Sequence, residues 1–381
     1  MTGLLETPYG TRDFLPEEAA VKRAVEEKIF KLFASFGYEE VVTPTMEYLE
    51  TLTTSSGRAQ EPQLFKMFDR NNRTLALRHE MTTPIARLAV SRLKDSPLPL
   101  KLSYNTNVFR FRTNQPGRQC EFYQAGVELL GISNAFADAE IIALAAQALK
   151  VAGLADFKIC LGQVEFAGGL MGNLSPDIQA EIKSAIERHD MVALNNLPVD
   201  DKLKKIPTLQ GGKEILSAAE VLADNERSRR ALNNLTEIYR LLEIYGVADK
   251  ITFDLGLIRD FEYYTGMVFE AYSHGVGYSL AGGGRYDNML KDFGAPLTAT
   301  GFALGIERIL SARKFQGVVE SARVKNFYLS YDAGQEEAAI KKAAELRAAD
   351  KVVEVSLTPQ TKSDAEKSCA AKNCTELIYL A

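Results

Sequence analysis

Apolar residues near the start of the chain recur at helical spacing. After Pro16 and two acidic residues, Val21, Val25, Ile29 and Phe33 follow at every fourth position until Gly37. This periodicity predicts an amphipathic helix, because side chains four residues apart lie on one face. The apolar run that follows, residues 41–43, predicts a strand that ends at a proline, as expected at a sheet edge or an interface.

Further along, short β-branched and aromatic runs predict strands. Residues 65–68 and 74–77 flank a turn with two asparagines and predict a hairpin. Two longer strands are expected at 102–111 and 121–129, on either side of a polar loop with Pro116-Gly117. Other strands are expected at 253–257, 268–272 and 278–281.

Helical patterns lie between these strands in no regular alternation. Residues 138–151 are apolar on nearly all sides and predict a buried helix, and residues 301–312 predict another. A more polar helical insertion is expected at about 170–248, within a first domain of residues 1–320. In residues 325–381 a strand, a helix at 335–348 and strands at 352–355 and 377–379 predict a small C-terminal α/β domain. The fold class is therefore α+β.

Composition narrows the class of protein. The chain has 381 residues, 46% hydrophobic and 25% charged, and a net charge of −5, which argues against strong nonspecific nucleic-acid binding. Its four cysteines form no Cys-x-x-Cys pair, so we expect no metal site. The N-terminus has no signal-peptide pattern and no apolar run is long enough to span a membrane. We expect a cytoplasmic protein.

One predicted strand carries a buried-carboxylate pattern. Along residues 121–129, alternation places Gln124, Gly126 and Glu128 on the same face. A carboxylate buried there needs a cation or a hydrogen-bond donor, because burying an unanswered charge costs several kcal/mol. A solvated strand face explains the same pattern, and periodicity alone does not separate the two explanations.

A glycine-rich run supplies the second indication of a pocket. The three glycines of residues 282–284 let a ligand lie against the backbone, although such runs also serve packing. Arg259, about twenty residues earlier, offers a planar fork suited to a carboxylate. Neither a dinucleotide fingerprint nor a P-loop is present. Polar residues gathered at the strand ends of this half of the chain would suit an amino acid: Glu80, Thr82, Arg110, Gln124, Glu128, Arg259, Tyr263, Tyr264 and Tyr286.

From about residue 8 to residue 315 the chain resembles the histidyl-tRNA synthetase family, a class II family. The resemblance rests on Gly10 to Pro16, on the helix and strand up to Pro44, on Phe109-Arg110 with Phe122-Tyr123-Gln124, on residues 301–308, and on the 259–264 and 280–287 stretches. It implies an antiparallel sheet flanked by helices and a homodimeric core. It also implies that Glu80, Thr82 and Gln124 hold the α-amino group of histidine, that Glu128 and Tyr264 hold the imidazole, and that Arg259 holds the carboxylate.

Two departures from the synthetases matter. Their ATP loop reads His/Tyr-Glu-Arg-Pro, whereas this chain has Phe111-Arg112-Thr113-Asn114, which reverses one charge and removes another. The Tyr-Tyr-Thr-Gly run at 263–266 and the short tail resemble the paralogue that regulates ATP phosphoribosyltransferase. This implies a non-catalytic subunit without a cofactor, partnered with a short-form catalytic subunit in a hetero-oligomer, and no tRNA partner. The alternative is a truncated or divergent histidyl-tRNA synthetase.

Overall fold

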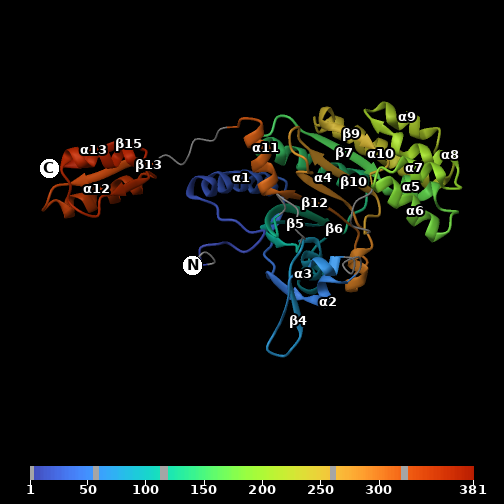
Figure 1. Cartoon of the computed structure of the whole chain (residues 1–381), viewed down its shortest axis with the longest axis horizontal. Helices are drawn as coiled ribbons and strands as arrows, with labels where there is room; N and C mark the ends of the chain where they lie inside the picture. Colours follow the sequence, from blue (N-terminus) through green and yellow to red (C-terminus); the bar gives the residue numbers. More distant parts are fainter. Residues whose placement is uncertain (1–3, 55–59, 112–118, 258–262, 319–324) are drawn as a thin grey trace. The chain divides into compact units, whose positions relative to one another are not determined.

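The chain is described by a computed structural model that covers residues 4–54, 60–111, 119–257, 263–318 and 325–381 (Figure 1). Contacts divide it into two compact units. The larger lies within residues 1–13 and 22–318, and the smaller within residues 14–21 and 319–381.

A nine-stranded mixed sheet forms the centre of the larger unit, within the described residues. In order across the sheet the strands are β1 (Glu39–Glu40), β5 (Leu100–Phe109), β6 (Glu121–Leu130), β12 (Ala299–Gly305), β11 (Ala281–Arg285), β10 (Met267–Tyr272), β7 (Lys158–Gln163), β9 (Ile251–Asp254) and β8 (Gln210–Gly211). Neighbouring strands from β5 to β7 in this order are antiparallel, whereas β1 runs parallel to β5 and β9 runs parallel to β7. The predicted class, an antiparallel sheet flanked by helices, is confirmed, with parallel pairs added towards both edges.

Helices α1 (Pro16–Ser35) and α4 (Ala135–Val151) supply much of the core on one face of this sheet. Val25, Ile29 and Phe33 of α1 are fully buried, so the predicted apolar face is the one that packs. Helix α4 is apolar on nearly all sides because the sheet and α10 (Glu226–Ile244) both contact it. The buried helix expected at 138–151 is confirmed.

The predicted helical insertion is a run of helices between β7 and β9 (Figure 1). It has its own small core, to which Ile182, Leu194 and Leu203 contribute. The helices of the run before α10 are α5 (Val164–Leu170), α6 (Pro176–Glu187), α7 (Met191–Asn196), α8 (Asp201–Lys205), the 3-10 turn η3 (Ile206–Thr208) and α9 (Glu214–Glu220), and the turn η4 (Ala248–Lys250) follows α10. The long amphipathic helix α10 is the last helix of the run and packs on α5 and α4.

The opposite face of the sheet carries α3 (Thr82–Arg92) and the 3-10 turn η5 (Met289–Phe293), which share a core with β5. Before α3 come the short helix α2 (Leu49–Leu52) and a three-stranded sheet of β2 (Met46–Tyr48), β4 (Thr74–Leu77) and β3 (Lys66–Phe68). The predicted hairpin is β3–β4, and Asn72 takes a left-handed φ of 62° in its turn. The strand expected at residues 41–43 is wrong, because the backbone pairs on either side of them, in β1 and β2.

Two further predictions near the glycine run are wrong. Residues 301–305 belong to strand β12, and the helix α11 begins only at Ile306 and ends at Phe315. The strand expected at 278–281 starts instead at Ala281 and runs to Arg285 as β11. Both strands lie in the middle of the sheet with both faces covered, so their sequence is continuously apolar or glycine-rich and lacks alternation.

The smaller unit contains a three-stranded parallel sheet in the order β14 (Val353–Val355), β13 (Lys325–Tyr331), β15 (Cys374–Leu380). Helix α12 (Glu336–Ala348) was expected from the sequence, whereas α13 (Lys362–Ala371) was not. Only Ala365 and Cys369 of α13 are buried, so its apolar stripe is too narrow to stand out. Within the described residues, no helix is long and apolar enough to cross a membrane.

Candidate functional site

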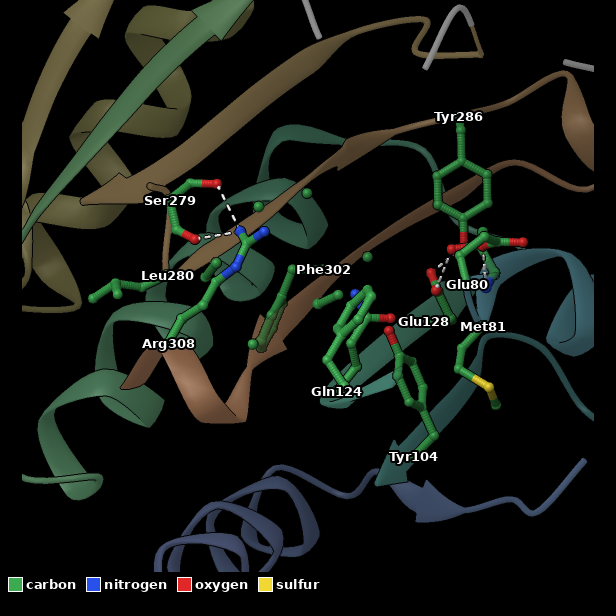
Figure 2. A pocket seen from close by; sticks show the side chains of 18 of the residues that line it. Glu80, Met81, Tyr104, Gln124, Glu128, Ser279, Leu280, Tyr286, Phe302 and Arg308 are labelled. Atoms are coloured by element: carbon green, nitrogen blue, oxygen red, sulfur yellow. Dashed lines mark hydrogen bonds between the residues drawn. The ribbon is translucent and has the colours of Figure 1, made fainter. Parts of the chain in front are cut away.

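A pocket of about 100 Å³ opens where β6, β11 and β12 meet the start of α3. Every predicted site residue that the structure describes lines it, namely Glu80, Thr82, Arg110, Gln124, Glu128, Tyr263, Tyr264 and Tyr286. Arg259 lies outside the described residues. Figure 2 shows Glu80, Glu128 and Tyr286 gathered at one end of the pocket and Arg308 with Ser279 at the other.

Glycines keep the floor of the pocket open. Gly301 lies opposite Glu128 in the β6–β12 register, and a Cβ at Gly301 would collide with Glu128 Oε2. A Cβ at Gly126 would collide with the Tyr104 hydroxyl, and one at Gly284 would approach the Tyr264 ring to 2.7 Å. These positions need glycine because carboxylate and aromatic side chains, together with backbone carbonyl oxygens of the neighbouring strands, occupy the space that a Cβ would need.

Glu128 is the buried carboxylate of the pocket, with 2% of its surface exposed. The solvated strand face that could also explain its pattern is therefore excluded. Thr82 Oγ1 donates to Oε1 at 2.9 Å, and the Tyr286 hydroxyl donates to Oε2. In the part of the chain that the structure describes, no cation pairs with it. Burial raises the pKa of Glu128 to about 8, and the two hydrogen bonds oppose that rise.

Glu80 is held by the first turn of α3. The backbone N–H of Thr82 donates to Oε2 at 2.6 Å and that of Thr83 donates to Oε1 at 2.9 Å. The positive end of the helix dipole favours a carboxylate in this place. Glu80 is thus fixed beside Glu128, which gives this end of the pocket two acidic side chains.

Gln124 adds a hydrogen-bond acceptor without a donor to the same pocket. Its side chain is 9% exposed, and within the described residues its Oε1 has no hydrogen-bond partner. A buried amide oxygen without a donor is unfavourable by about 1–3 kcal/mol. A ligand ammonium or N–H group placed against Gln124 would remove that penalty.

Two half-buried arginines occupy the remaining wall. Arg110 Nε donates to the His79 carbonyl oxygen at 2.8 Å, and its guanidinium carbon lies 5.3 Å from the centre of the Phe122 ring. Arg308, in the first turn of α11, donates to the Ser279 carbonyl oxygen at 2.6 Å and lies 5.3 Å from the Tyr278 ring centre. The pocket is therefore acidic at the end of Glu80 and Glu128 and basic at the end of Arg308, as suits a zwitterion (Figure 2).

Arg285, which follows the three glycines, has a structural role. Arg285 Nη2 lies 2.8 Å from Asp138 Oδ1 and Nη1 lies 3.0 Å from Asp287 Oδ1, so it ties β11 to α4. Sequence reasoning also missed Tyr104 and Phe302, which line the pocket. The alternation of β5 places Tyr104 opposite Gly126, which is the signal that could have identified it. No cluster of three or more potential metal ligands occurs among the described residues.

A family model described as histidyl-tRNA synthetase matches residues 10–309. A protein of Moorella thermoacetica named ATP phosphoribosyltransferase regulatory subunit is 42% identical over 97% of this chain and 96% of its own length. A protein of the same name from Symbiobacterium thermophilum is 39% identical over 98% of this chain and 96% of its own.

Solved structures of the same family are also similar to this chain. A Bacillus halodurans structure titled ATP phosphoribosyltransferase regulatory subunit/histidyl-tRNA synthetase has a TM-score of 0.88 at 35% identity and covers 99% of both chains. Histidyl-tRNA synthetase from Nostoc sp. shares the fold, with a TM-score of 0.84 at 20% identity over 99% of this chain and 92% of its own. The protein belongs to the histidyl-tRNA synthetase family, in the branch whose curated members are named ATP phosphoribosyltransferase regulatory subunits.

Proposed function

We propose that this chain is a regulatory subunit of ATP phosphoribosyltransferase that binds histidine in the pocket of Glu128. It activates a short-form catalytic subunit and contributes to inhibition by histidine, the end product of the pathway. The names of relatives that match nearly the whole chain support the regulatory role. The observation that most supports histidine as the ligand is the buried Glu128 carboxyl group. Among the described residues only hydroxyl groups donate to it, so an imidazole N–H of a ligand could supply a further hydrogen bond.

In this proposal the ligand supplies the hydrogen-bond partners that the polar groups of the pocket lack. Glu80, Thr82 and Gln124 take the α-amino group, which gives the Gln124 Oε1 a donor. Glu128 and Tyr264 take the two nitrogens of the imidazole, with Tyr286 holding Glu128 in place. Tyr263 and Arg110 close the wall, and Arg259 takes the carboxylate. The chain itself supplies no catalytic residue.

A synthetase activity is the competing function, since the chain keeps Arg110 and Arg308, the two arginines that, by the resemblance, would meet the ATP phosphates in a synthetase. The residues at the tip of the ATP loop oppose it, because Arg112 stands where synthetases have a glutamate and Thr113 where they have an arginine. Without these charges we expect no histidine-dependent exchange of pyrophosphate into ATP. Robust exchange would favour the synthetase over the regulatory subunit.

The proposed assembly is a homodimeric core inside a cytoplasmic hetero-oligomer with the catalytic subunit, without tRNA. Symmetry repeats each contact around such an assembly. Size measurement by light scattering, with the chain alone and after mixing with the catalytic subunit, tests this directly. A molar mass that does not increase on mixing would contradict the proposed assembly.

Calorimetric titration with histidine tests the ligand. We expect one site per chain and weak or no binding of amino acids that lack an imidazole, such as leucine. The heat should disappear in the Glu128→Ala variant, because the imidazole donor is then stranded. Unchanged affinity in that variant would contradict the proposed site.

A further inference from the structure

Arg78 is a buried arginine next to the pocket that neither the motifs nor the site has explained. It lies between β4 and α3, two residues before Glu80, and is 3% exposed. Burial lowers its pKa, and Glu47 opposes that shift. Long charged side chains are rarely buried this completely unless their donors are all satisfied.

The donors of Arg78 reach two separate segments of backbone. Nη1 donates to the Thr43 carbonyl oxygen at 2.8 Å and to that of Pro44 at 3.3 Å. Nε donates to the Asn107 carbonyl oxygen at 2.9 Å, and Nη2 donates to Asn107 Oδ1 at 3.2 Å and to Thr106 Oγ1. Because the guanidinium is planar, its five donors fix both segments in one geometry.

The backbone of Arg78 is fixed at the same place. Its N–H donates to the Thr45 carbonyl oxygen at 3.0 Å, and its own carbonyl oxygen accepts from the Phe109 N–H at 2.9 Å. Residue 78 is thus held on two sides, between the segment that leads into β2 and the end of β5.

Three of the next four residues make hydrogen bonds that continue into the pocket, and the fourth, Met81, lines the pocket while contacting Thr43. The His79 carbonyl oxygen accepts from Arg110, Glu80 accepts from the first turn of α3, and Thr82 donates to Glu128. Met81, which lines the pocket, has its sulfur 4.0 Å from Thr43 Oγ1. Figure 2 shows Glu80 and Met81 beside Glu128 and Tyr286, at the acidic end of the pocket. The acidic end therefore stands on the segment that Arg78 anchors.

We propose that Arg78 is a positioning residue for the histidine pocket. It touches no ligand but fixes residues 79–82, so that Glu80 and Thr82 stand where the α-amino group of the ligand binds. This inference rests on the proposed function. It predicts that a change at Arg78 weakens recognition of the amino group and weakens recognition of the imidazole much less, because Tyr286 also holds Glu128.

The test compares histidine with imidazolepropionate, which has the same ring and carboxylate but no amino group. In Arg78→Lys the charge stays and the planar fork is lost, so histidine affinity should fall about tenfold. The affinity for imidazolepropionate should change less than about twofold. A variant that merely destabilises the fold would move both ligands together or neither.

Two further variants keep the test decisive. Thr106→Val removes one acceptor of Arg78 with little change of shape, and should produce the same selective loss at a smaller size. Arg87→Lys is the matched control, because Arg87 pairs with Glu47 on β2 and, within the described part of the chain, its side chain makes no hydrogen bond to residues 78–82. It should leave both affinities unchanged.

The outcomes separate the two proposals. If the wild-type chain binds no histidine, the proposed function fails. If it binds histidine and both Arg78→Lys and Thr106→Val keep the wild-type ratio of the two affinities, Arg78 has no positioning role, while histidine binding stands.

Discussion

At the acidic end of the pocket Glu128 is buried among hydroxyl groups, whereas at the basic end Arg308 is half-buried and donates to a backbone carbonyl oxygen. Burial raises the pKa of Glu128 to about 8, so this end becomes more favourable when a ligand brings a donor. Water screens Arg308 in part, which lowers what an anion gains there. Ligand affinity should therefore be decided at the acidic end.

The largest effect is expected from Gly301→Ala. The new Cβ would collide with Glu128 Oε2, so the carboxylate must move. Histidine affinity, measured by calorimetry, should fall by about 100-fold or more, since small misplacements of a binding group carry penalties of that order. Gly277→Ala is the matched control, because nothing lies within 4 Å of a Cβ there. Equal binding by the two variants would show that Glu128 is not the recognition group.

The next largest effect is expected when a substitution at the acidic end of the pocket is compared with one at the basic end. Glu128→Gln keeps the shape but cannot ionise to the carboxylate that a ligand donor would favour, and histidine affinity should fall about 10- to 100-fold, as for other hydrogen bonds to charged groups. Arg308→Gln should change it by less than about twofold, because a half-exposed cation contributes little. The reverse order in a titration of both variants would place recognition at the basic end.

A smaller and more selective loss is expected from Gln124→Leu. The wild-type Oε1 has no partner within the described residues, and a ligand ammonium would supply one. Replacing the amide by an apolar group should weaken histidine about tenfold and leave imidazolepropionate unchanged. An equal loss for both ligands would mean that Gln124 shapes the pocket without reading the amino group.

The smallest effect is on stability without ligand. Because the pKa of Glu128 is raised from 4.5 to about 8 by burial, the folded protein keeps a proton between these values that the unfolded chain releases. The free energy of unfolding should therefore decrease as pH rises through that window. Glu128→Gln should decrease less over the same range in thermal unfolding followed by circular dichroism. Identical slopes would mean that Glu128 does not titrate as its burial implies.

The sequence predicted the pocket better than it predicted the boundaries of the elements. Alternation in one long strand placed Gln124 and Glu128 on a shared face, and the structure brings both to the pocket. Alternation disappears where both faces are covered, which is why residues 301–305 were mistaken for a helix. The partner of Arg285, Asp138, lies 147 residues away, and nothing local to either residue reveals the pair.

Phosphoribosyl transfer to ATP by the short-form catalytic subunit of the same organism, with and without this chain, tests the central claim most directly. Histidine is titrated into both reactions. We expect the chain to stimulate the transfer and the stimulated reaction to become sensitive to histidine. A transfer rate that the chain leaves unchanged, together with charging of tRNA by the chain alone, would contradict the regulatory role and identify a minimal synthetase.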